Sequence, residues 1–142
     1  MINFIKFFKH TSPQGFFYII EKMPNKLDKL AFFLSEEVDC FGSCRLMRLI
    51  NALEEDEDST CGNMIDIEKR GDFLYLGYVH NNPEYPYERL KISKKELFKL
   101  MIKWEKLMKE KPEEINLIQE NDQYELIEGN VFYKKIFRKK VK

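Results

Sequence analysis

Residues 92–112, which read ISKKELFKLMIKWEKLMKEKP, carry the strongest local signal in the chain. Their apolar side chains recur at steps of three and four, the spacing that aligns them along one side of an α-helix, and the lysines fall on its other sides. This apolar stripe consists of Leu97, Leu100, Met101, Trp104, Leu107 and Met108. An isolated helix of this length is only marginally stable, so the sequence predicts that the stripe is buried against a sheet.

Both ends of this helix are also predicted. Ser93 is placed to accept a hydrogen bond from a free N–H of the first turn, and Glu96 is placed to bond back to the cap, which is the pattern of a capping box. Ile92 and Leu97 have the spacing of a hydrophobic staple across this end. Pro112 ends the helix, because its ring clashes with the preceding turn and it has no N–H to donate.

Composition predicts one domain over residues 1–142. The chain is 44% hydrophobic and 34% charged, which suffices for a core of its own. The net charge is zero, but residues 131–142 carry six basic side chains and no acid, so the rest of the chain is acidic.

The odd set of cysteines (Cys40, Cys44 and Cys61) and the absence of a secretory signal predict a reducing cytoplasm. The sequence contains no run of about eighteen apolar residues, so we expect no transmembrane helix.

The first half of the chain is predicted to be mostly helical. Residues 2–10 fit either a helix or a strand, and we favour a helix because their polar side chains take helical steps. Residues 16–23 stay undecided. A helix capped by Asn25 is expected to run to about Asp39, and Ser43 is expected to cap the next one.

The second half is predicted to contain two hairpins. From Cys61 the apolar residues alternate with polar ones, and Arg70-Gly71 is taken as a two-residue loop. With this loop the facing pairs are Ile67 with Leu74 and Ile65 with Leu76, which form an apolar face for the Trp104 helix. The other face holds Met64, Asp66, Glu68, Phe73, Tyr75 and Val79, and we expect a second layer to cover it.

Residues 115–120 and 123–128 form the second predicted hairpin, and residues 131–142 could dock as a strand or a short helix. The predicted fold is therefore α+β, with an antiparallel sheet of four or more strands, a long amphipathic helix on one face and N-terminal helices.

Two segments are candidate contact surfaces for a partner. The acidic run consists of Glu54, Glu55, Asp56, Glu57 and Asp58. It fits a frayed helix end in a solvated loop as well as a surface that attracts a cationic partner. Residues 81–89 form a proline-stiffened loop with Tyr85 and Tyr87, which either serve an interface or pack on the core.

No catalytic or cofactor signature is present. The glycines do not have phosphate-loop spacing, so we expect no cofactor and no enzymatic activity. The cysteines with His10 and His80 lack zinc-site spacing, and buried free thiols are the favoured interpretation. The basic segment 131–142 supports an alternative function in nucleic-acid binding.

The segment from residue 44 to 128 resembles small cytoplasmic immunity proteins of bacterial contact-dependent growth inhibition and other polymorphic toxin systems. The resemblance is carried by Gly62-Asn63 at a strand start, the following strand pair, and the Ser-capped helix with a central Trp104 before Lys111-Pro112. It implies a protein without catalytic activity that binds a cognate toxin domain and occludes its active site. Charge and expected exposure, rather than a family motif, suggest a nuclease toxin and a contact surface made of the acidic run, Tyr75, Tyr85 and Tyr87.

Overall fold

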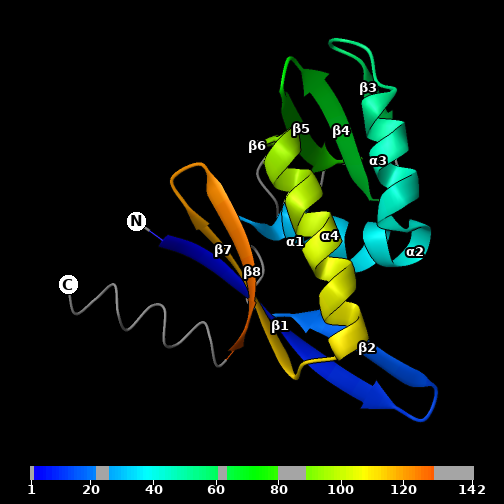
Figure 1. Cartoon of the computed structure of the whole chain (residues 1–142), viewed down its shortest axis with the longest axis vertical. Coiled ribbons are helices and arrows are strands. Elements are labelled where there is room, and N and C mark those ends of the chain that lie inside the picture. The colour runs from blue at the N-terminus through cyan, green and yellow to red at the C-terminus, as the bar shows by residue number, and fades with distance from the viewer. Residues whose placement is uncertain (1, 22–25, 61–63, 80–88, 130–142) are drawn as a thin grey trace.

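The computed structural model describes residues 2–21, 26–60, 64–79 and 89–129, with only the backbone described for residues 58–60. Within these ranges the strands form two antiparallel four-stranded sheets, with the helices beside and between them (Figure 1). The first sheet has the order β2-β1-β7-β8, and its strands are β1 (Ile2–Ser12), β2 (Gly15–Ile20), β7 (Glu114–Glu120) and β8 (Gln123–Glu128). The second has the order β3-β4-β5-β6, with β3 (Asp58–Thr60), β4 (Ile65–Arg70), β5 (Phe73–Tyr78) and β6 (Leu90–Ser93).

The predicted long helix is α4 (Lys94–Glu110), which runs from the second sheet past the first (Figure 1). Ser93 caps it as predicted, because the Ser93 hydroxyl accepts the N–H of Glu96 at 3.1 Å. The second half of the predicted capping box is replaced: the Glu96 carboxylate accepts the Tyr124 N–H at 3.2 Å and pairs with Lys99 at 2.7 Å. The helix ends at Glu110, and its C-cap residue Lys111 adopts a left-handed conformation (φ 55°) just before Pro112.

Trp104 is the centre of the core and is fully buried, with 0% of its surface exposed. Its ring lies 4.9 Å from that of Phe7 in β1 and 5.9 Å from that of Tyr18 in β2. The apolar stripe of α4 is therefore buried on a sheet, as predicted. The rings that meet Trp104 come from the N-terminal hairpin, which was not the partner that the sequence suggested.

The prediction of a helix over residues 2–10 is wrong, because this segment is strand β1. Ile5 and Phe7 point into the core, while Phe4 and Phe8 on the opposite side stay exposed. This alternation is satisfied because β1 pairs with both β2 and β7, and the pairing with β7 joins segments more than 100 residues apart. The undecided apolar segment after the turn becomes β2.

The next segment is helical, as predicted, but its details differ. The helices α1 (Asp28–Phe32), η1 (Phe33–Val38, with π-helical bonding) and α2 (Asp39–Phe41) follow one another, and the predicted cap Asn25 lies outside the described residues. Gly42, with φ 83°, separates them from α3 (Ser43–Asn51). Ser43 is the first residue of α3 and not its cap, since its buried N–H donates to Glu105 Oε1 at 3.1 Å.

The first predicted hairpin forms with a shifted register. The loop is Gly71-Asp72, not Arg70-Gly71, so Ile67 faces Leu76 and Ile65 faces Tyr78. Gly71 has φ 62°, which the first loop position of a tight hairpin turn requires and which glycine adopts without strain. A shift of two residues leaves every side chain on its predicted face, and Ile65 and Ile67 are buried.

The second predicted hairpin is confirmed as β7 and β8, joined at Asn121-Asp122. None of the helices in the described ranges has the length and apolar character that a membrane crossing requires.

Candidate functional site

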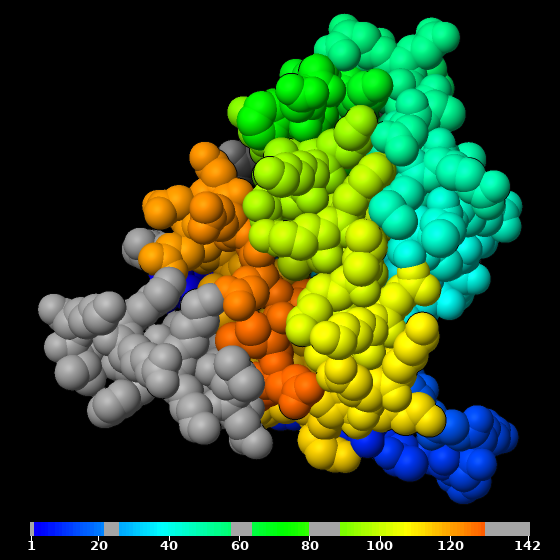
Figure 2. Space-filling view, viewed as in Figure 1, coloured from blue at the N-terminus to red at the C-terminus, as the bar shows by residue number. Residues whose placement is uncertain are grey.

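The acidic run begins with a turn, here called the acidic turn (Glu54–Glu57), that connects α3 to β3. All four side chains are exposed, but the backbone does not fray. The Asp56 N–H donates to the carbonyl of Lys69 at 2.8 Å, and the Lys69 N–H donates to the carbonyl of Glu57 at 3.3 Å. These bonds attach the turn to β4, so the acids stand at a defined place at one end of the molecule (Figure 2).

Glu55 fixes the acidic turn to the β4–β5 turn. Its two carboxylate oxygens accept the Gly71 N–H at 2.7 and 2.9 Å. The Lys69 ammonium donates to the carbonyl of Leu53 at 3.2 Å on the other side of the acidic turn. Residues 54–57 thus form a solvent-exposed turn after the end of α3, as the loop interpretation expected, and hydrogen bonds to the neighbouring hairpin hold its backbone.

Arg70 joins the acidic turn to Tyr75, a second predicted contact residue. Its guanidinium pairs with Glu68, lies 3.9 Å from the Asp56 carboxylate and sits 5.1 Å from the centre of the Tyr75 ring. The hydrogen bond to Glu68 raises the pKa of Arg70, so this group keeps its charge. The acidic turn and Tyr75, which the sequence suggested as separate candidates, thus belong to one surface.

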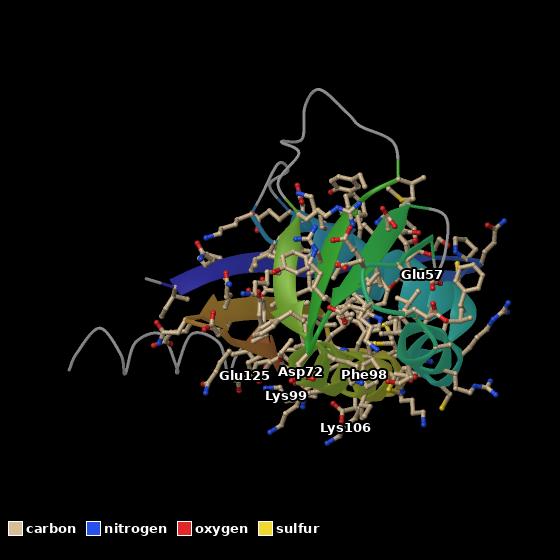
Figure 3. The ribbon with its side chains drawn as sticks, turned by 90° about the horizontal axis from the view of Figure 1, so that it is seen from above. Glu57, Asp72, Phe98, Lys99, Lys106 and Glu125 are labelled. Atoms are coloured by element: carbon tan, nitrogen blue, oxygen red, sulfur yellow. The ribbon has the colours of Figure 1, made fainter. Side chains whose placement is uncertain are left out.

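The outer face of the second sheet continues this surface. Arg89 donates to Asp66 at 2.7 Å and to the carbonyl of Tyr75 at 3.3 Å, and the Lys91 ammonium lies 4.2 Å from the centre of the Phe73 ring. Phe73 stays 40% exposed, so the predicted covering layer does not reach this end of the face. Figure 3 views the region from above, with Glu57 on the α3 side of β4 and Asp72 at the β4–β5 turn.

We call this region the hairpin surface. It consists of Glu54, Glu55, Asp56, Glu57, Glu68, Arg70, Asp72, Phe73 and Tyr75. Within this set the acids outnumber the one cation, Arg70, and the two aromatic rings lie beside them. Lys69, Arg89 and Lys91 border the set, where they bond to the Leu53 carbonyl, pair with Asp66 and stack on Phe73, respectively.

No protein-family model, curated protein or solved structure matches the chain. Function is therefore inferred from the surfaces and cavities of the molecule.

A cavity of about 840 Å³ is lined by parts of α1, β6 and the β7–β8 turn. Three of its four cations are engaged by the protein: Lys29 lies 3.8 Å from Asp28, Arg89 donates to Asp66, and Lys91 stacks on Phe73. Acids of α4 and the β7–β8 turn line the same cavity, so its charges are mixed. Such a lining gives no preference for an anionic or a cationic ligand.

The remaining predictions concern the cysteines, a possible metal site and further candidate residues, and only some of these residues are described by the structure. Cys40 and Cys44 are free, as expected, but exposed, because both lie on the outer sides of short helices at the Gly42 joint. Within the described ranges no three metal-binding side chains come together. Several predictions lie outside these ranges or concern side chains that are not described, and they stay predictions: those on Asp58, Cys61, Gly62-Asn63, His80, Tyr85, Tyr87 and residues 131–142.

One exposed surface was not found from the sequence. Phe4, Phe8, Phe17 and Ile19 stand on the outer face of the first sheet, and Phe17 is 54% exposed. The signal was present as the alternation of Phe4 and Phe8 with the buried Ile5 and Phe7, but it was hidden by the helical interpretation of residues 2–10.

Proposed function

We propose that this chain is an immunity protein that binds a cognate bacterial toxin domain, a nuclease, through the hairpin surface and occludes its active site. The observation that carries the proposal is the acidic turn, whose carboxylates are exposed while its backbone is hydrogen bonded to β4 and the β4–β5 turn. A nuclease needs a cationic groove for its substrate, and a fixed array of carboxylates complements such a groove.

The fixed geometry of the acidic turn favours binding over mere solvation. A surface that is already ordered loses little conformational entropy on association, so more of the contact energy becomes affinity. Tyr75 and Phe73 add apolar anchors beside the carboxylates, and aromatic residues of this kind carry a large share of interface energies. Arg70 keeps the carboxylates of Glu68 and Asp56 from repelling each other.

Two acids of the hairpin surface, Glu54 and Asp72, are suited to a charge-reversal test that leaves the acidic turn intact. Glu55 and Asp56 take part in the internal hydrogen bonds and ion pairs described above. The exposed carboxylates of Glu54 and Asp72 take part in none of the hydrogen bonds or ion pairs found within the described residues. Reversing their charge therefore changes the field of the surface without removing a known internal contact.

The experiment measures association of the purified chain with the C-terminal domain of an exported protein encoded directly upstream of it. The combined Glu54→Lys and Asp72→Lys variant should slow association at least about tenfold at low salt and flatten its salt dependence, because steering by opposite charges is screened by ions. Each acid-to-lysine change raises the net charge by two units, so Glu110→Lys is the matched control for the single variants Glu54→Lys and Asp72→Lys, and Glu110 lies at the far end of α4 (Figure 1).

Unchanged kinetics in the double variant would reject the hairpin surface as the contact. The function itself is tested by co-expression, in which the chain should protect cells from the upstream domain. An upstream frame without such a domain, or no protection and no binding, would reject the proposal.

A further inference from the structure

The strand β2 forms one edge of the first sheet. In the order β2-β1-β7-β8 it pairs with β1 alone. Among the described residues, no backbone hydrogen bond reaches its other side. The hairpin of β1 and β2 also extends from the lower end of the molecule (Figures 1 and 2). One side of β2 is therefore an edge at which a further strand can add to the sheet.

Two hydrogen bonds show which backbone groups of β2 point to this edge. The Glu21 N–H donates to the carbonyl of Lys6 at 2.9 Å, so Lys6 bonds toward β2. The Lys9 N–H donates to the carbonyl of Glu113 at 2.9 Å, so Lys9 bonds away from β2. Hydrogen-bonded and non-bonded pairs alternate along an antiparallel ladder. With the register of β1 and β2, the N–H and C=O groups of residues 16, 18 and 20 point to the edge.

The other three edge strands carry features that discourage a further strand, namely shortness or charge. The strand β3 has three residues, β6 has four residues that include Lys91, and β8 carries Glu125 and Glu128. The sequence of β2, in contrast, is GFFYII, six residues without a charge or a proline. Of the four edges of the described sheets, β2 is thus the one without such protection.

Both faces of β2 are apolar. On the outer face of the sheet, Phe17 is 54% exposed and Ile19 is 48% exposed. On the inner face, Phe16 and Ile20 are half-buried and pack against the main core. A strand that adds to this edge therefore meets apolar side chains on both faces, in addition to the outward-pointing backbone groups.

The edge is complementary to a second copy of itself. When two β2 strands lie antiparallel about a twofold axis at Tyr18, residue 16 of one copy faces residue 20 of the other. Residues 16, 18 and 20 are those with outward N–H and C=O groups, so three facing pairs exchange two hydrogen bonds each. The same register places Phe17 opposite Ile19 of the second copy, an aromatic and β-branched pair of the kind that stabilises sheets.

Charge and area indicate how strong this contact is. The strand has no charge and the whole chain has a net charge of zero, so two copies do not repel each other. An aromatic side chain covers about 150–250 Å², so the exposed parts of Phe17 and Ile19 amount to roughly 200 Å² per chain. Two such contributions are small beside the roughly 1,200–2,000 Å² of stable interfaces, and we expect a dissociation constant on the order of 10–100 μM.

We propose that two copies of this chain pair through β2, antiparallel about a twofold axis at Tyr18, and join their first sheets into one continuous sheet. The occupant of the edge is a second copy, and the contact is isologous because each copy contributes the same strand. The hairpin surface lies at the other end of the molecule and stays open in this dimer (Figure 1). Pairing through β2 is therefore independent of toxin binding.

Sedimentation velocity of the full chain tests the dimer, which should form between about 1 and 300 μM, the range of a small interface. Ile19→Ser should weaken it at least about tenfold, because a twofold contact loses each substituted side chain twice. Phe4→Ser is the matched control, since Phe4 is 45% exposed on the same face but lies on β1 beside β7. It should leave the dissociation constant within about twofold of the wild-type value.

Amide hydrogen exchange of the wild type, measured by NMR, provides a second readout that needs no substitution. When about nine-tenths of the chain is dimeric, the amides of residues 16, 18 and 20 should exchange about tenfold more slowly, because they exchange only from the monomer. The amides of residues 17 and 19 are directed to β1 in both states and should change by less than about twofold. This alternation is specific to pairing at the edge.

A chain that stays monomeric at every concentration would overturn the proposal. Equal weakening of the dimer by Ile19→Ser and Phe4→Ser would assign the contact to the outer face of the sheet, and uniform protection along β2 would do the same. Either result would reject edge pairing. Protection of residues 16, 18 and 20 only by the domain encoded upstream, in a chain that is monomeric alone, would assign the edge to that partner and reject a second copy.

Discussion

The indole N–H of Trp104 donates a 2.8 Å hydrogen bond to the Oδ1 atom of Asp39. Trp104 is the largest fully buried side chain, and Asp39 begins α2, at the joint between η1 and α3. The single polar atom of the indole is therefore satisfied by a residue from a distant part of the chain. This bond ties α4 to the N-terminal helices, while the Trp104 ring packs on the first sheet.

Removing the acceptor should show how much this hydrogen bond contributes to the free energy of unfolding. Asp39→Ala leaves the buried indole N–H without a partner, which costs about 1–3 kcal/mol of unfolding free energy. Asp39→Asn keeps an oxygen acceptor and should cost less than half as much. Urea unfolding followed by fluorescence measures both variants, since Trp104 is the only tryptophan. Equal losses in the two variants would contradict a role for the hydrogen bond.

The same aspartate should make stability depend on pH. Desolvation raises the pKa of Asp39 above its ordinary value of 3.8, with Glu36 and Glu105 adding to the rise, while the hydrogen bond from Trp104 acts in the other direction. The folded state therefore binds this proton at a higher pH than the unfolded state does. The stabilisation from protonation is complete below pH 3.8 and is lost as pH rises through the raised pKa.

We thus expect the wild type to gain stability relative to Asp39→Asn as pH falls from 7 towards 4, a window in which the asparagine does not titrate. Urea midpoints of both proteins at several pH values measure the difference. A difference that stays constant would show that the Trp104 hydrogen bond balances desolvation, and one that shifts in favour of the asparagine variant would show that it outweighs desolvation; either result would contradict the prediction.

The cap of α4 gives a third prediction. Ser93→Ala removes the acceptor for the Glu96 N–H and should cost about 1 kcal/mol, whereas Ser93→Asp retains an acceptor and should be nearly neutral. Glu96→Ala instead removes the carboxylate that accepts the Tyr124 N–H. Hydrogen exchange at the Tyr124 amide should therefore be faster in Glu96→Ala, a change that Ser93→Ala should not produce. Thermal unfolding and amide exchange measure the two effects separately.

Local signals explain which parts of the fold were predictable. The cap, the apolar stripe and the proline stop of α4 lie within 21 residues, and the β7–β8 hairpin closes over two. The strand β1 was missed because its conformation depends on pairing with β7, in which Phe7 faces Ile115. The local pattern of residues 2–10 carries no signal of a pairing strand more than 100 residues away in the sequence.

The hairpin surface was predictable in its parts but not in its assembly. Charge and expected exposure identified the acidic run and Tyr75 as candidates. Their connection through Arg70 requires the actual register of β4 and β5, which places Arg70 opposite Phe73 at the loop. The loop position in turn decides that the Gly71 N–H is free to meet Glu55. A shift of two residues left the faces unchanged but altered which residues form the turn.

The last prediction concerns the hydrogen bond between Glu55 and Gly71. Substitutions of Glu55 distinguish the contribution of backbone order from that of charge in the acidic turn. Glu55→Ala removes the acceptor of the Gly71 N–H, so hydrogen exchange at that amide should quicken about tenfold, the factor that corresponds to roughly 1.4 kcal/mol. Glu54→Ala is the control, because the Glu54 carboxylate does not bond to Gly71. Unchanged exchange in Glu55→Ala would mean that the backbone bonds of Asp56 alone order the turn.

Glu55→Gln then distinguishes the two contributions of this side chain to partner binding. The glutamine keeps an oxygen acceptor for Gly71 but loses the charge, whereas the alanine loses both. If an ordered turn is what favours association, the alanine variant should dissociate faster from the partner than the glutamine variant does, while both should associate more slowly than the wild type because each has lost one charge. Equal dissociation rates for the two variants would show that the charge of the acidic turn matters and its order does not.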